Sequence, residues 1–108
     1  MDRDTRELYE LKAGVLQAIA HPLRLAVLDV LRGGETCVCE IAERVGAKRS
    51  NISRHLAVML KAGVLSSRKE GLQVFYSLRT PCVLDFLKCV ARVLRQRRDR
   101  TNALLRKL

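Results

Sequence analysis

Apolar side chains recur every three or four residues in five segments of the chain, which is the spacing of an amphipathic helix. The segments are residues 5–20, a stretch from 21–22 to the Gly33-Gly34 pair, residues 37–45, residues 48–62, and a last stretch that begins at Thr80-Pro81. Pro22 suits a first helical turn, and Thr36 and Thr80 stand where N-caps are needed. Glycines close the second, third and fourth segments. The pattern therefore predicts five helices.

Between the fourth and the last helix the spacing changes to two, the period of a half-buried strand. Residues 72–78 alternate between the two faces of a strand, with Leu72, Val74, Tyr76 and Leu78 on the apolar one, and residues 64–69 supply a partner strand across a turn at 70–71. The predicted order is helix, helix, helix, helix, strand, strand, helix (α-α-α-α-β-β-α) in one α+β domain, 1–108. Two short helices joined by a tight turn and followed by a hairpin form a winged helix-turn-helix.

The last helix carries an apolar stripe that is wider than one contact surface requires. The stripe consists of Val83, Leu87, Val90 and Leu94, widened by Leu84, Phe86, Ala91 and Val93. A chain of 108 residues builds only a modest core, and a dimer interface adds apolar burial. We therefore expect a homodimer that forms through the first and last helices.

The net charge of +10 and the pI of about 10.2 indicate a polyanionic partner, a nucleic acid before a membrane. From Arg44 to Lys69 there are seven basic residues and no acidic one, and a second basic stretch runs from Arg92 to Lys107, broken only by Asp99. The alternative interpretation of both stretches is a solvated surface. No apolar run approaches the ~20 residues that span a membrane.

The second helix of a helix-turn-helix enters the major groove of DNA, so its exposed early residues are the candidates for contact with operator DNA. The candidates are Lys48, Arg49, Ser50, Asn51, Ser53, Arg54 and His55 on this helix, and Arg68 and Lys69 on the wing. Arginine can bind guanine and asparagine can bind adenine, each through two hydrogen bonds, whereas serine and lysine more often contact phosphates. We interpret His55 as a packing or phosphate-contacting residue and His21 as a helix-boundary residue.

Four segments together resemble the ArsR/SmtB family of metal-sensing repressors: His21-Pro22-Leu23-Arg24-Leu25, Cys37-Val38-Cys39-Glu40-Ile41-Ala42, Ser50-Asn51-Ile52-Ser53-Arg54-His55-Leu56 and Gly71-Leu72-Gln73-Val74-Phe75-Tyr76-Ser77-Leu78. The resemblance implies a homodimer that occupies operator-promoter DNA and dissociates when it binds its ion. One departure is Lys48, which stands where the family often has a serine that caps the recognition helix.

The four cysteines are Cys37, Cys39, Cys82 and Cys89. The charged N-terminus lacks a signal-peptide core, so we expect a cytoplasmic protein, in which metal ligation or thiol redox chemistry is more usual than a disulfide. Cys37-Val38-Cys39 resembles the Cys-Val-Cys of the arsenite- and antimonite-responsive branch. Thiolates select soft ions, and a helix N-terminus and nearby basic residues lower a thiol pKa.

The spacing of Cys37 and Cys39 predicts a strained site. Residues i and i+2 are about 200° apart around a helix, whereas two thiolates on one ion lie within about 4.6 Å of each other. Chelation is therefore expected to unwind the start of the third helix and to disturb the recognition helix. The third position that some family members use is Ala42 here, so the third ligand is water, a small thiol, Cys82 or Cys89.

Cys82 and Cys89 lie on one face of the last helix, about 10.5 Å apart in rise, so one protomer cannot clamp one ion with both. We favour buried packing roles for them, and the alternative is that they meet across antiparallel last helices in a dimer. The last helix has no histidine, which argues against the zinc and cobalt sensors that the family also contains.

The leading hypothesis is a repressor that releases DNA when As(III) or Sb(III), its inducer, binds the cysteines, with no permanent cofactor and no membrane partner. The alternative is a repressor of the same fold that senses another soft ion (Cd, Pb or Cu) or an oxidant or persulfide. An enzyme is disfavoured, because the chain lacks Cys-x-x-Cys, His-Glu-x-x-His and a glycine-rich phosphate loop.

Overall fold

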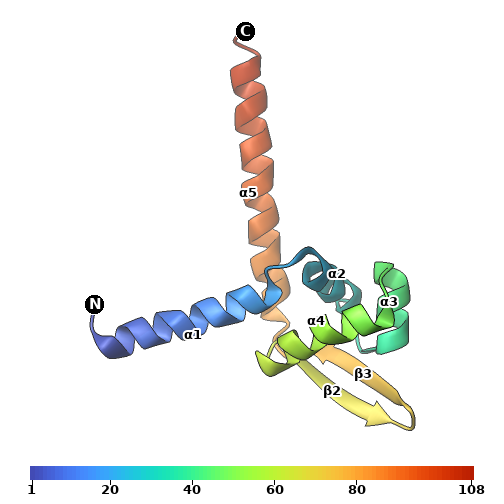
Figure 1. The fold of residues 1–108 in the computed structure, drawn as a ribbon. Coiled ribbons are helices and arrows are strands. Elements are labelled where there is room, and N and C mark those ends of the chain that lie inside the picture. Colours follow the sequence, from blue (N-terminus) through green and yellow to red (C-terminus); the bar gives the residue numbers. More distant parts are fainter.

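The computed structural model describes all residues from 1 to 108, and these form five helices and a three-stranded antiparallel sheet (Figure 1). In chain order the elements are α1 (Arg3–Ile19), α2 (Pro22–Leu31), β1 (Thr36–Cys37), α3 (Val38–Val45), α4 (Arg49–Lys61), β2 (Leu65–Glu70), β3 (Gln73–Leu78) and α5 (Cys82–Leu105). This arrangement confirms the winged helix-turn-helix.

The predicted order was wrong at one point, because it lacked β1. This strand pairs Thr36 with Tyr76 and Cys37 with Phe75, so the sheet order is β1-β3-β2. A strand of two residues is too short to show an alternation of its own. It exists because β3 offers a free edge, and it brings the first cysteine into the sheet.

The helix starts show which side chains act as caps. Asp2 caps α1 by accepting a hydrogen bond from the Thr5 N–H at 2.7 Å. His21 caps α2, since its Nδ1 accepts from the Leu23 N–H at 3.1 Å, and this confirms His21 as a helix-boundary residue. Lys48 occupies the N-cap position of α4 and makes no side-chain cap there, because an ammonium group cannot accept a hydrogen bond.

The two threonine caps that the sequence predicted are absent. The Thr36 hydroxyl donates to the Gly34 carbonyl at 2.9 Å instead, and α3 begins after Cys37. At the last helix, Pro81 takes the N-cap position and α5 begins at Cys82, with no side-chain cap from Thr80. Thr36 belongs to β1, where it pairs with Tyr76, and Thr80 lies before α5, where its carbonyl accepts from the Val83 N–H at 3.0 Å.

The core lies among α2, α3, α4 and the start of the hairpin. Its completely buried side chains, with about 0% exposure, are Val27, Leu28, Ile41, Ile52, Leu56 and Met59. One expected apolar position is wrong: Leu72 is 96% exposed, because Glu70 pairs with Gln73, which makes Gly71-Leu72 the turn in place of residues 70–71.

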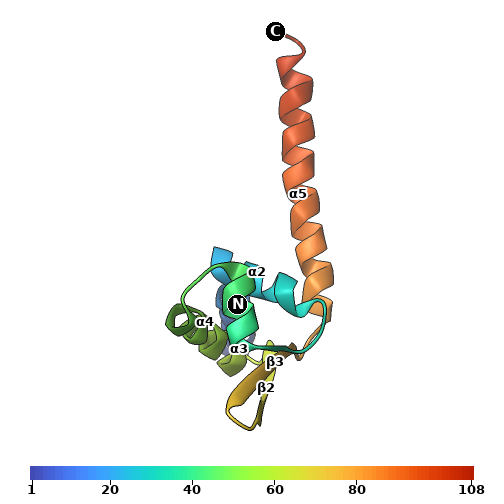
Figure 2. The same cartoon turned by 90° about the vertical axis from the view of Figure 1, so that its right-hand side faces the viewer.

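Helices α1 and α5 project from this core in different directions (Figures 1 and 2). Only Val83 and Leu87 of α5 pack partly buried against the core, as expected for one side of its stripe.

No single helix is long and apolar enough to cross a bilayer. Helices α1 and α2 are long and apolar enough only when they are counted as one span, and a bend of 81° separates them.

Candidate nucleic-acid interface and thiol pair

Helix α4 is held by its apolar side and presents its polar side to solvent. Ile52 and Leu56 have 0% exposure and fix the helix in the core. Gly46 closes α3 in the left-handed conformation (φ 78°), so the connection to α4 is only a few residues long. The exposed candidates at this helix start are Lys48, Arg49, Ser50, Ser53 and Arg54, and Asn51 and His55 are half-buried beside them.

Two of these candidates form a pair on the surface of α4. The Arg54 Nη2 donates to the Asn51 Oδ1 at 3.0 Å, one helical turn away. The contact presents a guanidinium next to an amide, which are the two groups best suited to guanine and adenine edges. A role for this pair in base reading stays a prediction.

His55 belongs to a polar cluster that connects three helices. Arg24 Nε donates to the His55 Nδ1 at 3.1 Å, and Arg24 Nη1 donates to the carbonyls of Gln17 and Ala18 at 3.4 and 3.3 Å. The His21 ring lies 4.4 Å from the His55 ring. Burial lowers the pKa of His55, and the neighbouring charges of His21, Arg24 and Arg54 lower it further. The lowered pKa favours the neutral imidazole, whose Nδ1 accepts the hydrogen bond from Arg24.

Arg24 is the functional candidate that the sequence reasoning missed. It links the last turn of α1 to the recognition helix, and with His21, Asn51, Arg54 and His55 it lines a cleft of about 380 Å³. Its only sequence signal is its place in the segment after His21, because no pattern reveals a contact between residues 31 positions apart.

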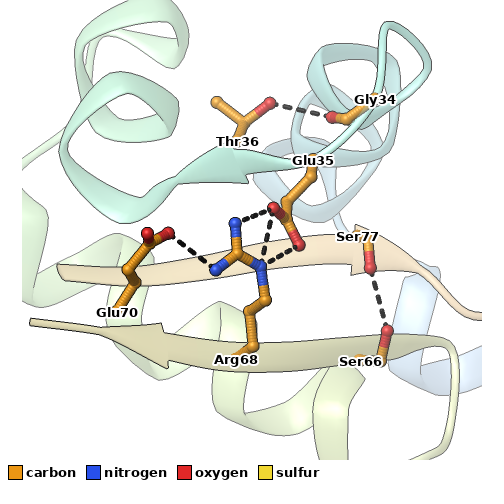
Figure 3. A network of polar contacts seen from close by, with 7 residues as sticks. All are labelled: Gly34, Glu35, Thr36, Ser66, Arg68, Glu70 and Ser77. Atoms are coloured by element: carbon orange, nitrogen blue, oxygen red, sulfur yellow. Dashed lines mark hydrogen bonds and ion pairs between the residues drawn. The ribbon is translucent and has the colours of Figure 1, made fainter.

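The wing residue Arg68 is already paired within the chain (Figure 3). Its guanidinium contacts Glu35 at 2.6 Å and Glu70 at 2.7 Å, and it lies 4.8 Å from the centre of the Phe75 ring. The carboxylates of Glu35 and then Glu70 raise the pKa of Arg68. A DNA phosphate would have to share this cation with Glu35, whereas the neighbouring Lys69 is exposed and makes no ion pair.

The sulfurs of Cys37 and Cys39 lie 3.2 Å apart, with no unwinding of helix α3. Cys37 is the N-cap of α3 and has an extended backbone (φ −76°, ψ 155°), whereas Cys39 lies in the first turn. The helical angle of about 200° does not apply, because Cys37 is outside the helix. The premise that the first turn keeps the two sulfurs apart was therefore wrong, whereas an effect of chelation on α3 stays a prediction.

The surroundings of Cys37 favour its thiolate. The Cys39 thiol, by hydrogen bonding, is the largest cause of a lowered Cys37 pKa, and the Glu40 backbone N–H at the helix start lowers it further. The direction agrees with the sequence prediction, and the Glu40 N–H supplies the expected contribution of the helix start, but no basic residue lowers this pKa. Cys37 is half-buried and Cys39 is exposed, so the pair is accessible to a small solute.

The other two cysteines do not join this pair. Cys82 and Cys89 are both exposed in the single chain, so the prediction of buried packing roles is wrong there. No group of three or more histidine, cysteine, aspartate or glutamate side chains has the arrangement of a metal site within one chain. A third ligand for an ion at Cys37 and Cys39 would come from solvent, a small thiol or a second subunit.

Comparisons with known proteins agree on one family. The profile of the bacterial regulatory protein arsR family matches residues 21–67. The HTH-type transcriptional regulator Rv0081 of Mycobacterium tuberculosis is 35% identical over 99 residues, which cover 87% of each chain, and its crystal structure matches with a TM-score of 0.76 over 87% of this chain and 96% of that chain.

Two further relatives bear on activity and assembly. The transcriptional repressor SdpR of Bacillus subtilis is 37% identical over 71 residues, 66% of this chain and 79% of that protein. The homodimeric winged helix-turn-helix DNA-binding domain of Mb0332 from Mycobacterium bovis has a TM-score of 0.78 at 26% identity, over 93% of both chains. These relatives are DNA-binding regulators.

Proposed function

The chain belongs to the arsR family of bacterial transcriptional regulators, and we propose that it is a homodimeric repressor that leaves its operator when As(III) or Sb(III) binds the thiolates of Cys37 and Cys39. The observation that carries this proposal is the separation of 3.2 Å between the two sulfurs at the junction of β1 and α3. Arsenic and antimony in this state are soft ions, for which thiolates are the preferred protein ligands.

The separation of the sulfurs suits a chelate that forms without strain. Two bonds of about 2.3 Å, the length of a zinc–thiolate bond, would span 3.2 Å with an angle of about 90° at the ion. That angle is narrower than the tetrahedral geometry of structural zinc. It favours a pyramidal ion with few ligands, whose remaining position is filled from outside the chain.

The position of the pair suggests how binding reaches the DNA-reading elements. Cys37 pairs with Phe75 of the wing, and two residues earlier Glu35 holds the wing residue Arg68. Cys39 lies in α3, which packs against α4. We propose that an ion that joins both sulfurs holds β1 and α3 in one arrangement, and that this arrangement of the wing and the recognition helix binds the operator less well than those open to the free thiols.

The test is release of operator DNA, followed by fluorescence anisotropy, during parallel titrations with arsenite, antimonite, Cd²⁺, Zn²⁺ and peroxide. Cys37→Ser and Cys39→Ser are expected to keep the fold and DNA binding but to lose release by arsenite, which in the wild type lowers affinity by about 5–150-fold, the range of typical coupling energies. Cys82→Ser and Cys89→Ser are the matched controls. If only the control variants lose release, the sensor lies on α5 and the assignment is wrong.

A second candidate is a repressor of the same fold that senses oxidants, and the lowered Cys37 pKa beside an exposed Cys39 favours it. The Cys37 thiolate would attack peroxide, giving a sulfenic acid and hydroxide. The Cys39 thiol would then condense with that acid, forming a disulfide and releasing water. Two results together identify this function. Peroxide releases the DNA in the same titration while arsenite does not, and the mass of the protein falls by two hydrogens.

Release by Cd²⁺ alone identifies a sensor of another soft ion.

A further inference from the structure

The end of α5 forms a basic surface that the proposed operator contacts do not use. We define the C-terminal arm as residues 95–108, all of which are exposed. Its cations are Arg95, Arg97, Arg98, Arg100, Arg106 and Lys107, and its one acidic residue is Asp99. Four of the six residues from Arg95 to Arg100 are arginine, so most of the charge is concentrated in less than two helical turns.

The arm is unsuited to continuing the apolar surface that precedes it. The apolar stripe of α5 is interrupted after Leu94: residues 95–102 (Arg-Gln-Arg-Arg-Asp-Arg-Thr-Asn) contain no apolar side chain, and the exposed Leu104, Leu105 and Leu108 follow only at the end of the arm. At about 100° per residue the four arginines point to different sides of the helix, so no face is free of charge. Residues 95–102 therefore offer no continuous apolar face to a subunit interface or to a bilayer.

The arm is also remote from the DNA-reading elements. Figures 1 and 2 place the C-terminus at the opposite end of the molecule from the β2–β3 hairpin, and the longest extent of the chain is 61 Å. A duplex held by α4 and the wing would therefore not be the polyanion that neutralises the arm. The charge of the arm remains available when the operator is bound.

We propose that the C-terminal arm binds a second DNA duplex, without sequence preference, while α4 and the wing hold the operator. Guanidinium groups bind phosphates through paired hydrogen bonds, and a duplex offers about one negative charge per 1.7 Å of its axis. Arg95 with Arg98, and Arg97 with Arg100, are three residues apart and lie about 60° from each other around the helix, so either pair can meet phosphates of one duplex. The choice of DNA rests on the membership of the chain in a family of DNA-binding regulators.

The test is capture of a second duplex. Operator DNA is fixed to beads and saturated with the full-length protein, and a labelled duplex of unrelated sequence is then added over a range of salt concentrations. The wild-type protein is expected to retain the labelled duplex at low salt and to lose it steeply as salt rises. The variant with Arg95, Arg97, Arg98 and Arg100 all changed to Gln is expected to lose the labelled duplex and to bind operator DNA as before.

Two controls make the outcome specific. The same four arginines changed to Lys keep the charge and are expected to keep the capture. Arg3→Gln with Arg6→Gln removes exposed charge from α1 instead of the arm and is expected to leave capture unchanged. Capture that survives the four Gln substitutions overturns the proposal. A second outcome also overturns it: the variant with four Gln substitutions loses binding to phosphatidylserine vesicles but captures the labelled duplex as before. That result would assign the arm to a membrane. Failure to bind the operator at all would count against the proposed function instead.

Discussion

Two regions of this molecule differ in how much of their apolar surface is buried within one chain: the part that holds the recognition helix, and the helices α1 and α5 that project from it. Every residue that is fully buried lies between Ala18 and Leu65, in the half that holds the recognition helix. Helix α5 has no fully buried residue, and α1 has only Ala18 and Ile19, next to the core. The DNA-reading half is therefore self-contained, whereas the arms that leave it present apolar surface with no cover.

Most of the uncovered apolar residues lie on the two helices that the sequence assigned to a dimer. Among them are Leu8, Leu11, Val15 and Leu16 on α1, and Phe86, Val90, Val93 and Leu94 on α5, each 42–63% exposed. Burying one such side chain contributes about 1.5–3 kcal/mol, so this surface is costly unless a partner covers it. The similarity to the homodimeric Mb0332 domain supports a second copy of the chain as that partner.

The largest effect is expected from truncating a buried leucine, with an exposed leucine as the comparison. Leu56→Ala removes a side chain with 0% exposure and is expected to lower the free energy of unfolding by about 2–5 kcal/mol, because it leaves a cavity between α4 and the core. Leu72→Ala, at the 96% exposed hairpin tip, is expected to change it by less than about 0.5 kcal/mol. Urea denaturation of both variants provides the comparison, and equal losses would contradict the assigned burial.

The second test concerns the uncovered surface of α5. Phe86→Glu places a carboxylate in the proposed dimer interface and is expected to weaken dimerisation at least about tenfold, since a buried unpaired charge is strongly unfavourable. Phe86→Leu keeps the surface apolar and is the control. Sedimentation at micromolar concentration gives the result. A wild-type protein that sediments only as a 12.2 kDa species would refute a dimer altogether.

The same contrast explains how much the sequence revealed. Periodicity found all five helices and the hairpin, because the apolar positions that define each of them repeat over several residues of a regular element. It missed β1, since two residues carry no period, and with it the position of Cys37 outside the helix. The separation of the sulfurs therefore could not be predicted from the spacing in the sequence alone. Contacts such as Arg24 with His55 depend on how separate helices pack.

A third, smaller effect is expected on the DNA-reading half. Arg54→Ala removes the guanidinium paired with Asn51 and is expected to cost about 1–3 kcal/mol in operator binding and to relax base preference. Lys69→Ala, on the wing, is expected to weaken binding equally for all sequences and to reduce the salt slope by about 1. Anisotropy titrations against operator and scrambled duplexes, each at several salt concentrations, separate these effects. If both variants bind like the wild type, α4 and the wing do not form the interface.

The smallest effect concerns the thiol pair. Cys37 and Cys39 lie at the start of α3, whereas Cys82 and Cys89 carry the same thiol groups in the different surroundings of α5. Hydrogen bonds from Cys39 and from the Glu40 N–H lower the Cys37 pKa below its ordinary value of 9.0. A lowered pKa leaves more thiolate at a given pH, so alkylation of Cys37 by iodoacetamide is expected to reach half its maximal rate at a lower pH than for an ordinary thiol. Cys39→Ala removes the largest of these hydrogen bonds, and the midpoint for Cys37 is expected to rise. Peptide mass spectrometry after timed alkylation measures each cysteine separately. Cys37 loses its proposed role as the activated thiol if its midpoint stays unchanged in the Cys39→Ala variant.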